Sequence, residues 1–462
     1  MVVGLLPLMA VEGVMRLADW GNVNEVEDPF IGFMGIQPLF ERNRSTGRDE
    51  IPVSRQALFR PESFAAVKSP DELRIFCLGG STVQGRPYAI ETSFTTWLEL
   101  SLRAADPRRK WQVINCGGVS YASYRLVPIM REVLDYQPDL FVLYVGHNEF
   151  LEDRTYHHVK RTPRLLANIH SSMTECRTYN GLRSLALRLS GQLNARARLP
   201  ADADPLLDYR GGFESYRRDD AWRDATIAHF RFSLRQMLRL ARSANVPLLL
   251  CNPVANIRDV PPFKSEPSDR LSADQRAAVH QLVTAAQADV DVARRLDLLD
   301  QALAIDDRHP RALYLLGRLH LEQAQTDRAK RTLLRAKDND ICPLRILEQM
   351  HDVIQRLAAE HRVPLVDIRR SFESQSPGGI PGNQWLLDHV HPTIEGHQRI
   401  AQALVREMVR LQLVEPVTGW ESRRATLFRE HRQSLPADYF AEAETRMQGL
   451  RRWTSGRAFQ AK

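Results

Sequence analysis

The sequence predicts an α/β protein built on a parallel five-stranded sheet that is covered by helices on both faces. The first observation behind this fold class is that short apolar runs alternate with segments of helical periodicity along the chain. The second is that these runs lack the polar alternation of a strand with one solvent-exposed face. Parallel strands in this order require right-handed crossovers through the helices between them.

Each element follows from its local sequence. The first predicted strand ends in the sharp turn Gly79-Gly80, and Pro138 follows the second helix and precedes the third strand. The predicted strands are Ile75–Leu78, Val113–Ile114, Leu140–Val145, Val246–Cys251 and Val363–Ile368. The predicted helices are Phe94–Leu102, Leu126–Tyr136, Ile227–Ala241, Ile346–Glu360 and Ile394–Leu413.

Composition narrows the class of protein. The 462 residues are 43% hydrophobic and 26% charged, which is typical of a globular chain with room for two or three domains. The net charge of +7 is compatible with an anionic partner such as a membrane surface, but no nucleic-acid-binding motif accompanies it, so we expect no nucleic-acid partner. The five cysteines are scattered and form no CxxC pair, so we expect neither a disulfide framework nor a metal site.

The chain divides into six segments. Residues 71–260 and 344–415 form the two parts of the α/β domain. Residues 1–21 are apolar but too short for a clear membrane span; we interpret them as the trailing half of a membrane anchor, which suggests an extracytoplasmic, membrane-associated protein, or as a plain N-terminal helix. Residues 22–70 lack periodicity and are predicted to be irregular, and the basic residues 416–462 are predicted to form a strap over the body.

Two long intervals interrupt the alternation of strands and helices. Residues 152–220 are rich in arginine and follow a strand end directly, which suggests a lid, an anionic contact surface or a solvated excursion without a role. Residues 261–343 are helical. Leu299 and Ala302 recur as Leu333 and Ala336 at a period of 34, which resembles one to two tetratricopeptide (TPR) repeats.

Four loops carry the residue types needed for acyl transfer. Ser81 follows the first strand, Asn115-Cys116-Gly117-Gly118 the second, and Gly146-His147-Asn148-Glu149 the third; Asp388-His389-Val390-His391-Pro392 precedes the last helix. Attack on an ester needs a hydroxyl activated by an imidazole, a carboxylate that orients that imidazole, and hydrogen-bond donors for the oxyanion. Taken alone, Ser81 could instead cap the following helix.

In this order and on these loops, GGSTVQG, NCGG, GHNEF and DHVHP resemble the four blocks of the SGNH (GDSL-like) serine hydrolase superfamily, specifically its bacterial members with a TPR-like insertion. The resemblance covers roughly residues 59–413. It implies a three-layer α/β/α sandwich of flavodoxin-like type with a TPR-like helical insertion. It departs from the family at Gly80, where the family has Asp, and at Glu149, where it often has Asp.

The resemblance also implies roles for individual residues. Ser81 would be the nucleophile, His391 the base and Asp388 the residue that orients His391. The oxyanion hole would consist of the Ser81 and Gly117 backbone N–H groups and the Asn148 side-chain amide. We expect His389 to be structural and His397 to lie on a helix surface. Five further residues near the strand ends are candidates for substrate binding or for shaping the loops: His147, Glu149, Asn252, Asn256 and Arg258.

The expected function is a serine esterase or acyl-hydrolase that cleaves an ester-linked acyl or acetyl group, on a glycan or a lipid, without metal or cofactor. Two alternatives stay open. One is an O-acyltransferase that uses the same triad. The other is a non-catalytic scaffold that presents the TPR-like helices to a protein partner.

Overall fold

The computed structural model describes residues 2–18, 20, 37–152, 173, 176–189 and 202–454. Its centre is a parallel sheet in the order β5-β4-β6-β7-β8. The strands are β4 (Glu72–Gly79), β5 (Lys110–Gly117), β6 (Leu140–Tyr144), β7 (Leu248–Asn252) and β8 (Leu365–Asp367). All five fall on the predicted runs, so the predicted parallel sheet is confirmed.

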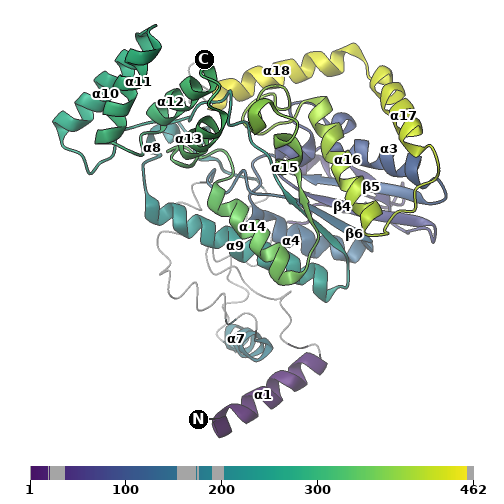
Figure 1. Cartoon of the computed structure of the whole chain (residues 1–462). Helices are drawn as coiled ribbons and strands as arrows, with labels where there is room; N and C mark the ends of the chain where they lie inside the picture. Colours follow the sequence, from purple (N-terminus) through teal and green to yellow (C-terminus); the bar gives the residue numbers. More distant parts are fainter. Residues whose placement is uncertain are drawn as a thin grey trace.

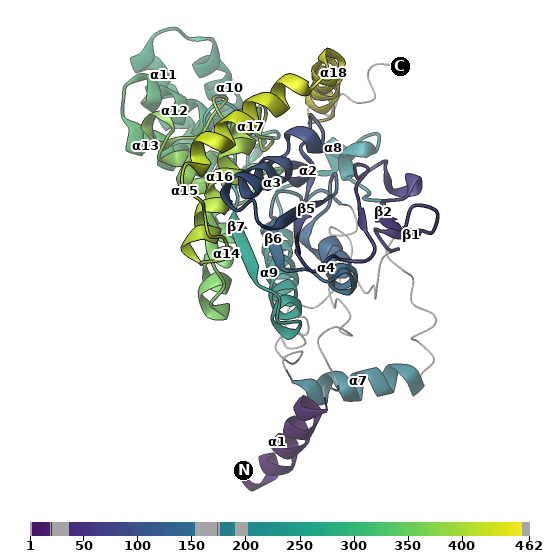
Figure 2. The same cartoon turned by 90° about the vertical axis from the view of Figure 1, so that its right-hand side faces the viewer.

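The sheet lies between two layers of helices (Figures 1 and 2). Successive residues of β4 show why both faces must be apolar. Phe76 and Leu78 pack with one set of helices, whereas Ile75 and Cys77 pack with the other. The first set is α4 (Ser123–Val133), α9 (Asp220–Ser243) and α14 (Glu348–His361); the second contains α3 (Phe94–Ala105) and α16 (Ile394–Arg410).

The segment predicted to be irregular contains a second sheet. Residues 41–65 form three antiparallel strands, β1 (Glu41–Asn43), β2 (Arg48–Glu50) and β3 (Ser63–Ala65). Phe64 of β3 is fully buried, and its ring lies edge-on to Phe76 of the main sheet at 5.6 Å between centroids. Three-residue strands are too short to produce a periodic pattern, which is why the sequence did not reveal them.

The helical insertion consists of four helices, α10 (Ala273–Ala288), α11 (Val292–Ile305), α12 (Pro310–Glu322) and α13 (Thr326–Asp338). The residues that suggested a repeat lie at helix contacts: Leu299, Ala302, Leu333 and Ala336 are all buried. A Cβ atom at Gly317 would lie 2.8 Å from the Leu333 side chain, so α12 and α13 pack closely there. Classification of these helices as TPR repeats stays a prediction.

Both ends of the chain are helical where they are described. The N-terminal helix α1 (Val2–Leu17) contacts α7 (Arg177–Leu189), whose first N–H groups donate to the Glu12 carboxylate. Among the helices of the described ranges, none combines the length and apolarity needed to cross a bilayer. At the other end, α17 (Trp420–Ser434) and α18 (Ala437–Thr454), yellow in Figure 1, run across the body. Residues 153–172, 174–175 and 190–201 of the arginine-rich 152–220 interval lie outside the described residues, and with them the predicted lid or contact surface.

Candidate active site

Ser81, His391 and Asp388 form one continuous hydrogen-bonded chain. Ser81 is the first residue of the short helix α2 (Ser81–Gln84), which begins where β4 ends. Its Oγ lies 2.7 Å from His391 Nε2, although the two residues are 310 positions apart in the sequence. On the other side of the ring, His391 Nδ1 lies 2.7 Å from Asp388 Oδ2. This arrangement can transfer a proton from the serine hydroxyl to an oriented imidazole.

The Asp388 carboxylate is held in its ionised form. Burial by itself would raise the Asp388 pKa, but the facing His391 and His389 rings and the hydrogen bonds from His391 outweigh that effect and hold the pKa well below its ordinary value. Asp388 Oδ1 also accepts the backbone N–H groups of Val390 and His391, at 2.9 and 2.8 Å. A carboxylate fixed in this way selects the His391 tautomer whose Nε2 can accept the Ser81 proton.

His389 lies beside this chain without joining it at Ser81. Its ring packs edge-on against Phe263 at 5.0 Å and against His391 at 5.9 Å between centroids. Burial lowers the His389 pKa to about 4. An uncharged, packed imidazole suits the structural role that the sequence predicted for His389, although its side chain does line the cavity described below.

Two of the three predicted oxyanion donors keep a free N–H among the residues that the structure describes: the Asn148 side-chain amide and the Ser81 backbone. The Asn148 side chain lines the cavity beside Ser81, and its Nδ2 donates one hydrogen bond to the Tyr121 carbonyl at 3.0 Å, which leaves the second N–H of the amide for a substrate. Within the described ranges, the Ser81 backbone N–H donates to no protein group. Both therefore remain candidate donors.

Gly117 does not suit the role predicted for it. Its N–H donates to Asn115 Oδ1 at 2.9 Å, and a Cβ atom at this position would lie 2.2 Å from Gln84 N, so Gly117 is packed beneath α2. The loop instead turns at Ser120, whose φ of 63° is rare for a residue with a side chain. Ser120 lines the cavity, and in the described part of the chain its N–H donates to no protein group. Ser120 thus replaces Gly117 as the candidate donor from this loop.

The departure of Gly80 from the family pattern has a direct steric reason. A Cβ atom at Gly80 would lie only 2.4 Å from Asn148 Nδ2. Any side chain at this position would therefore displace the amide that faces the Ser81 hydroxyl region. In this chain, the absence of a side chain at Gly80 makes room for Asn148.

The cavity beside Ser81 has a volume of about 390 Å³. Its walls are mostly apolar and come from distant parts of the chain: Leu58, Val119, Leu151, Ala203, Leu344, Val390, Leu450 and Trp453. Helix α18 forms one wall, where Trp453 Nε1 donates to Asp208 Oδ1 at 2.6 Å. The sequence suggested that the C-terminal segment lies over the body, but not that it lines this cavity.

Five residues predicted as substrate contacts lie outside the cavity lining. Glu149 accepts hydrogen bonds from the Ser123 N–H and hydroxyl and so braces the start of α4. Asn252 contacts His351 and Asp367, and Asn256 contacts Asn383. Arg258 lies near Asp259 at 3.9 Å. Each shapes a loop instead, because its polar atoms are directed at other protein groups.

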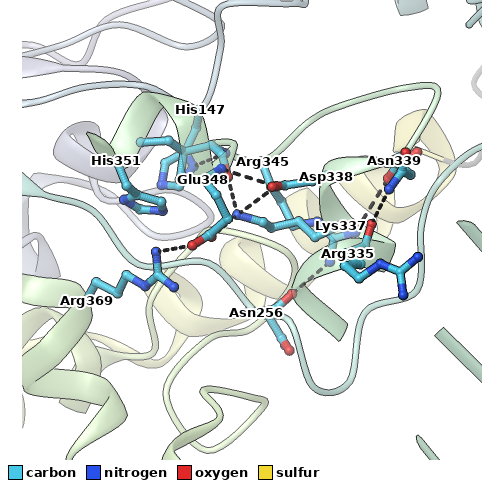
Figure 3. Close-up of polar contacts among 12 residues, drawn as sticks. His147, Asn256, Arg335, Lys337, Asp338, Asn339, Arg345, Glu348, His351 and Arg369 are labelled. Carbon is cyan, nitrogen blue, oxygen red and sulfur yellow. Dashed lines mark hydrogen bonds and ion pairs between the residues drawn. The ribbon is translucent and has the colours of Figure 1, made fainter. Parts of the chain in front are cut away.

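His147 is the fifth of these residues, and it belongs to a buried network that reaches the helical insertion (Figure 3). Its Nδ1 accepts the Ile346 N–H at 3.3 Å, and Lys337 of α13 donates to the Ile346 carbonyl at 2.7 Å. Lys337 and Arg369 both pair with Glu348, at 2.7 and 2.8 Å. The network therefore connects the loop that carries Asn148 to α13.

His397 is buried, contrary to the predicted surface position. The side chain is 0% exposed, and its Nδ1 accepts the Phe94 N–H at 3.1 Å. Burial lowers the His397 pKa to about 3. His397 shares the apolar face of α16 with Ile394, Ala401 and Leu404, so the helical periodicity places it inside and the surface prediction overlooked that pattern.

Within the described ranges, no group of three or more His, Cys, Asp or Glu side chains is arranged to hold a metal ion. Burial raises the pKa of the Cys77, Cys116, Cys251 and Cys342 thiols, which makes these cysteines unreactive core residues. Ser81 is therefore the nucleophile candidate at this site.

No family model matches the chain, and no curated protein matches it in sequence. Several solved structures are similar. The acetyl xylan esterase AlAXEase has 13% identity and a TM-score of 0.33, with 72% of this chain and 98% of that chain covered. A catalytic mutant of an acetylxylan esterase from Geobacillus stearothermophilus has 15% identity and a TM-score of 0.32, with 74% and 96% covered.

A protein from Desulfitobacterium hafniense, described as a putative lipolytic protein of the G-D-S-L family, has 10% identity and a TM-score of 0.30, with 72% of this chain and 98% of that chain covered.

Proposed function

We propose that this chain is an SGNH-type serine esterase that cleaves an ester-linked acyl or acetyl group. The observation that carries the proposal is the hydrogen-bonded chain from Ser81 Oγ through His391 to Asp388, with 2.7 Å at each step. A serine that only capped α2 would not need an oriented imidazole at its hydroxyl. The adjoining cavity gives a substrate access to that hydroxyl.

The first half of the reaction forms an acyl-enzyme. Ser81 Oγ attacks the ester carbonyl carbon while its proton moves to His391 Nε2. The negative charge that develops on the carbonyl oxygen is stabilised by the N–H groups of Ser81 and Ser120 and by the Asn148 amide. His391 then returns the proton to the leaving alcohol oxygen as the carbon–oxygen bond of the ester breaks.

The second half releases the acyl group by the same steps in reverse. Water enters, His391 removes its proton, and the hydroxide formed attacks the acyl-enzyme carbonyl. Ser81 leaves as its alkoxide, takes the proton back from His391 and is restored. An acceptor alcohol in place of water would give an O-acyltransferase with no other change in the site.

A panel of 4-nitrophenyl esters from acetyl to decanoyl tests the proposal. The wild-type chain should hydrolyse at least one member, and Ser81→Ala should lose about 10⁶-fold in kcat, as in other enzymes that lose a serine nucleophile. The matched control is Ser101→Ala, because Ser101 is a buried serine whose hydroxyl donates to the Trp97 carbonyl away from the cavity. Equal activity in wild type and Ser81→Ala would refute the proposal.

The same assay distinguishes hydrolysis from transfer. A small alcohol is added and the products are separated as free acid and new ester. A product ratio that follows the concentrations of water and alcohol indicates a hydrolase, whereas formation of new ester at low alcohol concentration indicates an acceptor site. The apolar walls of the cavity favour an acyl chain over a bare acetyl group as the better substrate.

A further inference from the structure

The cavity beside Ser81 contains a cation, Arg86, whose side chain forms no hydrogen bond or ion pair with the part of the chain that the structure describes. Arg86 follows α2, the helix that begins with Ser81, and its side chain lines the cavity together with Ser81, Asn148 and His391. No hydrogen bond or ion pair joins the Arg86 side chain to any other group in the described ranges, and its Nε is shielded from solvent without a partner. Arg86 is half-buried, and a partly shielded guanidinium without a hydrogen-bond acceptor is less stable than one that a ligand pairs with.

Two further arginines, Arg60 and Arg446, bind the backbone next to Arg86. Arg60 Nη2 donates to the Tyr88 carbonyl at 3.3 Å, and Arg446 of α18 donates to the same carbonyl at 3.4 Å and to the Pro87 carbonyl at 3.1 Å. Two guanidinium groups therefore meet at one oxygen, two residues from Arg86. Of these three arginines, Arg446 alone forms an ion pair with a carboxylate of the described residues, that of Glu442.

The electrostatics agree with this geometry. Burial lowers the Arg86 pKa, and the positive charges of Arg60 and Arg446 lower it further; the charge of Asp388 opposes these effects without reversing them. Burial and the charge of Arg446 also lower the Arg60 pKa. The three side chains thus repel one another, and an anion beside Arg86 would relieve the repulsion.

We infer that Arg86, supported by Arg60 and Arg446, binds an anionic group of the substrate, a carboxylate or a phosphate, while the ester carbonyl lies at Ser81. A guanidinium forms two parallel hydrogen bonds with either group. The apolar walls of the cavity would hold the uncharged part of the same molecule. This inference rests on the proposed esterase function and narrows the substrate class from esters in general to anionic esters.

Matched pairs of esters test the inference. 4-Acetoxybenzoate and 4-acetoxybenzamide differ in charge on the alcohol side, and the phenyl monoester of adipic acid and its adipamide analogue differ on the acyl side. 4-Acetoxyphenyl phosphate distinguishes phosphate from carboxylate. In the wild-type chain, kcat/KM should be about tenfold higher for the anionic member of at least one pair, and Arg86→Gln should reduce this ratio about tenfold.

Arg410→Gln is the matched control, because Arg410 is 65% exposed on α16 and pairs with Glu407 outside the cavity. This variant should keep the wild-type ratio. If Arg86→Gln fails to fold, the salt dependence of the wild-type chain provides the test. Raising the salt concentration from about 0.01 M to about 1 M should reduce kcat/KM for the anionic ester and leave the neutral ester unaffected.

The anion site and the esterase activity are refuted by different results. If turnover depends on Ser81 but no pair shows a preference for the anion, or if the preference survives Arg86→Gln, the anion site is refuted and the esterase stands. If no ester is turned over and a fluorophosphonate does not label Ser81 in the folded chain, the proposed function itself is refuted.

Discussion

Replacing Asn148 by alanine should reduce catalysis strongly and stability only slightly. The amide has two N–H groups, of which one donates to the Tyr121 carbonyl at 3.0 Å and the other is available to the oxyanion. Removing one oxyanion donor typically costs a factor of about 10² to 10³ in kcat, or about 2.7 to 4 kcal/mol of transition-state stabilisation. Losing the hydrogen bond to Tyr121 should lower the free energy of unfolding by about 1 kcal/mol.

The assay is steady-state hydrolysis of the best ester in the panel, with the thermal unfolding midpoint measured on the same preparation. KM should change little, because the donor acts mainly on charge that develops in the transition state. The matched control is Asn256→Ala. Asn256 is a buried asparagine with a hydrogen-bonded amide, but it lies outside the cavity lining, so its loss should affect stability and leave kcat close to wild type.

Two results would refute this reasoning. If Asn148→Ala keeps kcat within about threefold of wild type while remaining folded, the amide is not an oxyanion donor and the geometry has been misinterpreted. If Asn256→Ala instead reduces kcat as much as Asn148→Ala does, the effect comes from disturbed loops and not from the cavity.

Three further predictions address the packing around the site. Gly80→Ala should lower kcat by about tenfold or more without loss of Ser81, because the new methyl group would displace Asn148 Nδ2; an unchanged kcat would contradict this. Lys337→Met should lower the free energy of unfolding in urea by about 1 to 3 kcal/mol, because the buried Ile346 carbonyl loses its donor while Arg369 still pairs with Glu348; a change below about 0.5 kcal/mol would contradict the role of the network. His397 has a lowered pKa of about 3, so below its ordinary value of 6.5 the unfolded chain binds a proton that the folded chain does not, and stability falls as the pH falls. His397→Gln should therefore reduce the pH slope of the unfolding free energy by about 1.4 kcal/mol per pH unit between about pH 4 and 6, and an unchanged slope would show that His397 does not contribute to it.

The sheet was predictable because its strands are buried on both faces. A run such as Leu140–Val145 is apolar throughout because both of its faces are buried between two layers of helices. Hydrophobicity alone therefore predicted these strands. The small sheet at residues 41–65 was not predictable in this way. Its three-residue strands are stabilised by long-range contacts, such as that between Phe64 and Phe76, which leave no periodic signal in the local sequence.

The candidate site was predictable where short motifs fix the chemistry. Ser81, Asn148, Asp388 and His391 come together as the first, third and fourth blocks suggested. The prediction of Gly117 as an oxyanion donor was wrong. A glycine in a loop can either allow close packing or supply a backbone N–H to a ligand, and the sequence does not distinguish these two roles. No sequence pattern marked Ser120 as a donor, because its role depends on a positive φ that serine rarely adopts.

Arg86 and helix α18 were missed for a different reason. Arg86 lies five residues after Ser81 in the sequence, but its importance comes from the lack of a partner among the described residues, which only the folded structure reveals. Leu450 and Trp453 reach the cavity from the far end of the chain. A helix that packs across the body by long-range contacts has no local sequence feature that marks the residues facing a cavity.

The most direct test of the esterase assignment is labelling with a fluorophosphonate, followed by peptide mass spectrometry. We predict a single adduct on Ser81 in the wild-type chain, its absence in Ser81→Ala, and much slower labelling in His391→Gln, because His391 removes the Ser81 proton. A folded wild-type chain that is not labelled, or that is labelled equally in Ser81→Ala, would contradict the assignment of Ser81 as the nucleophile.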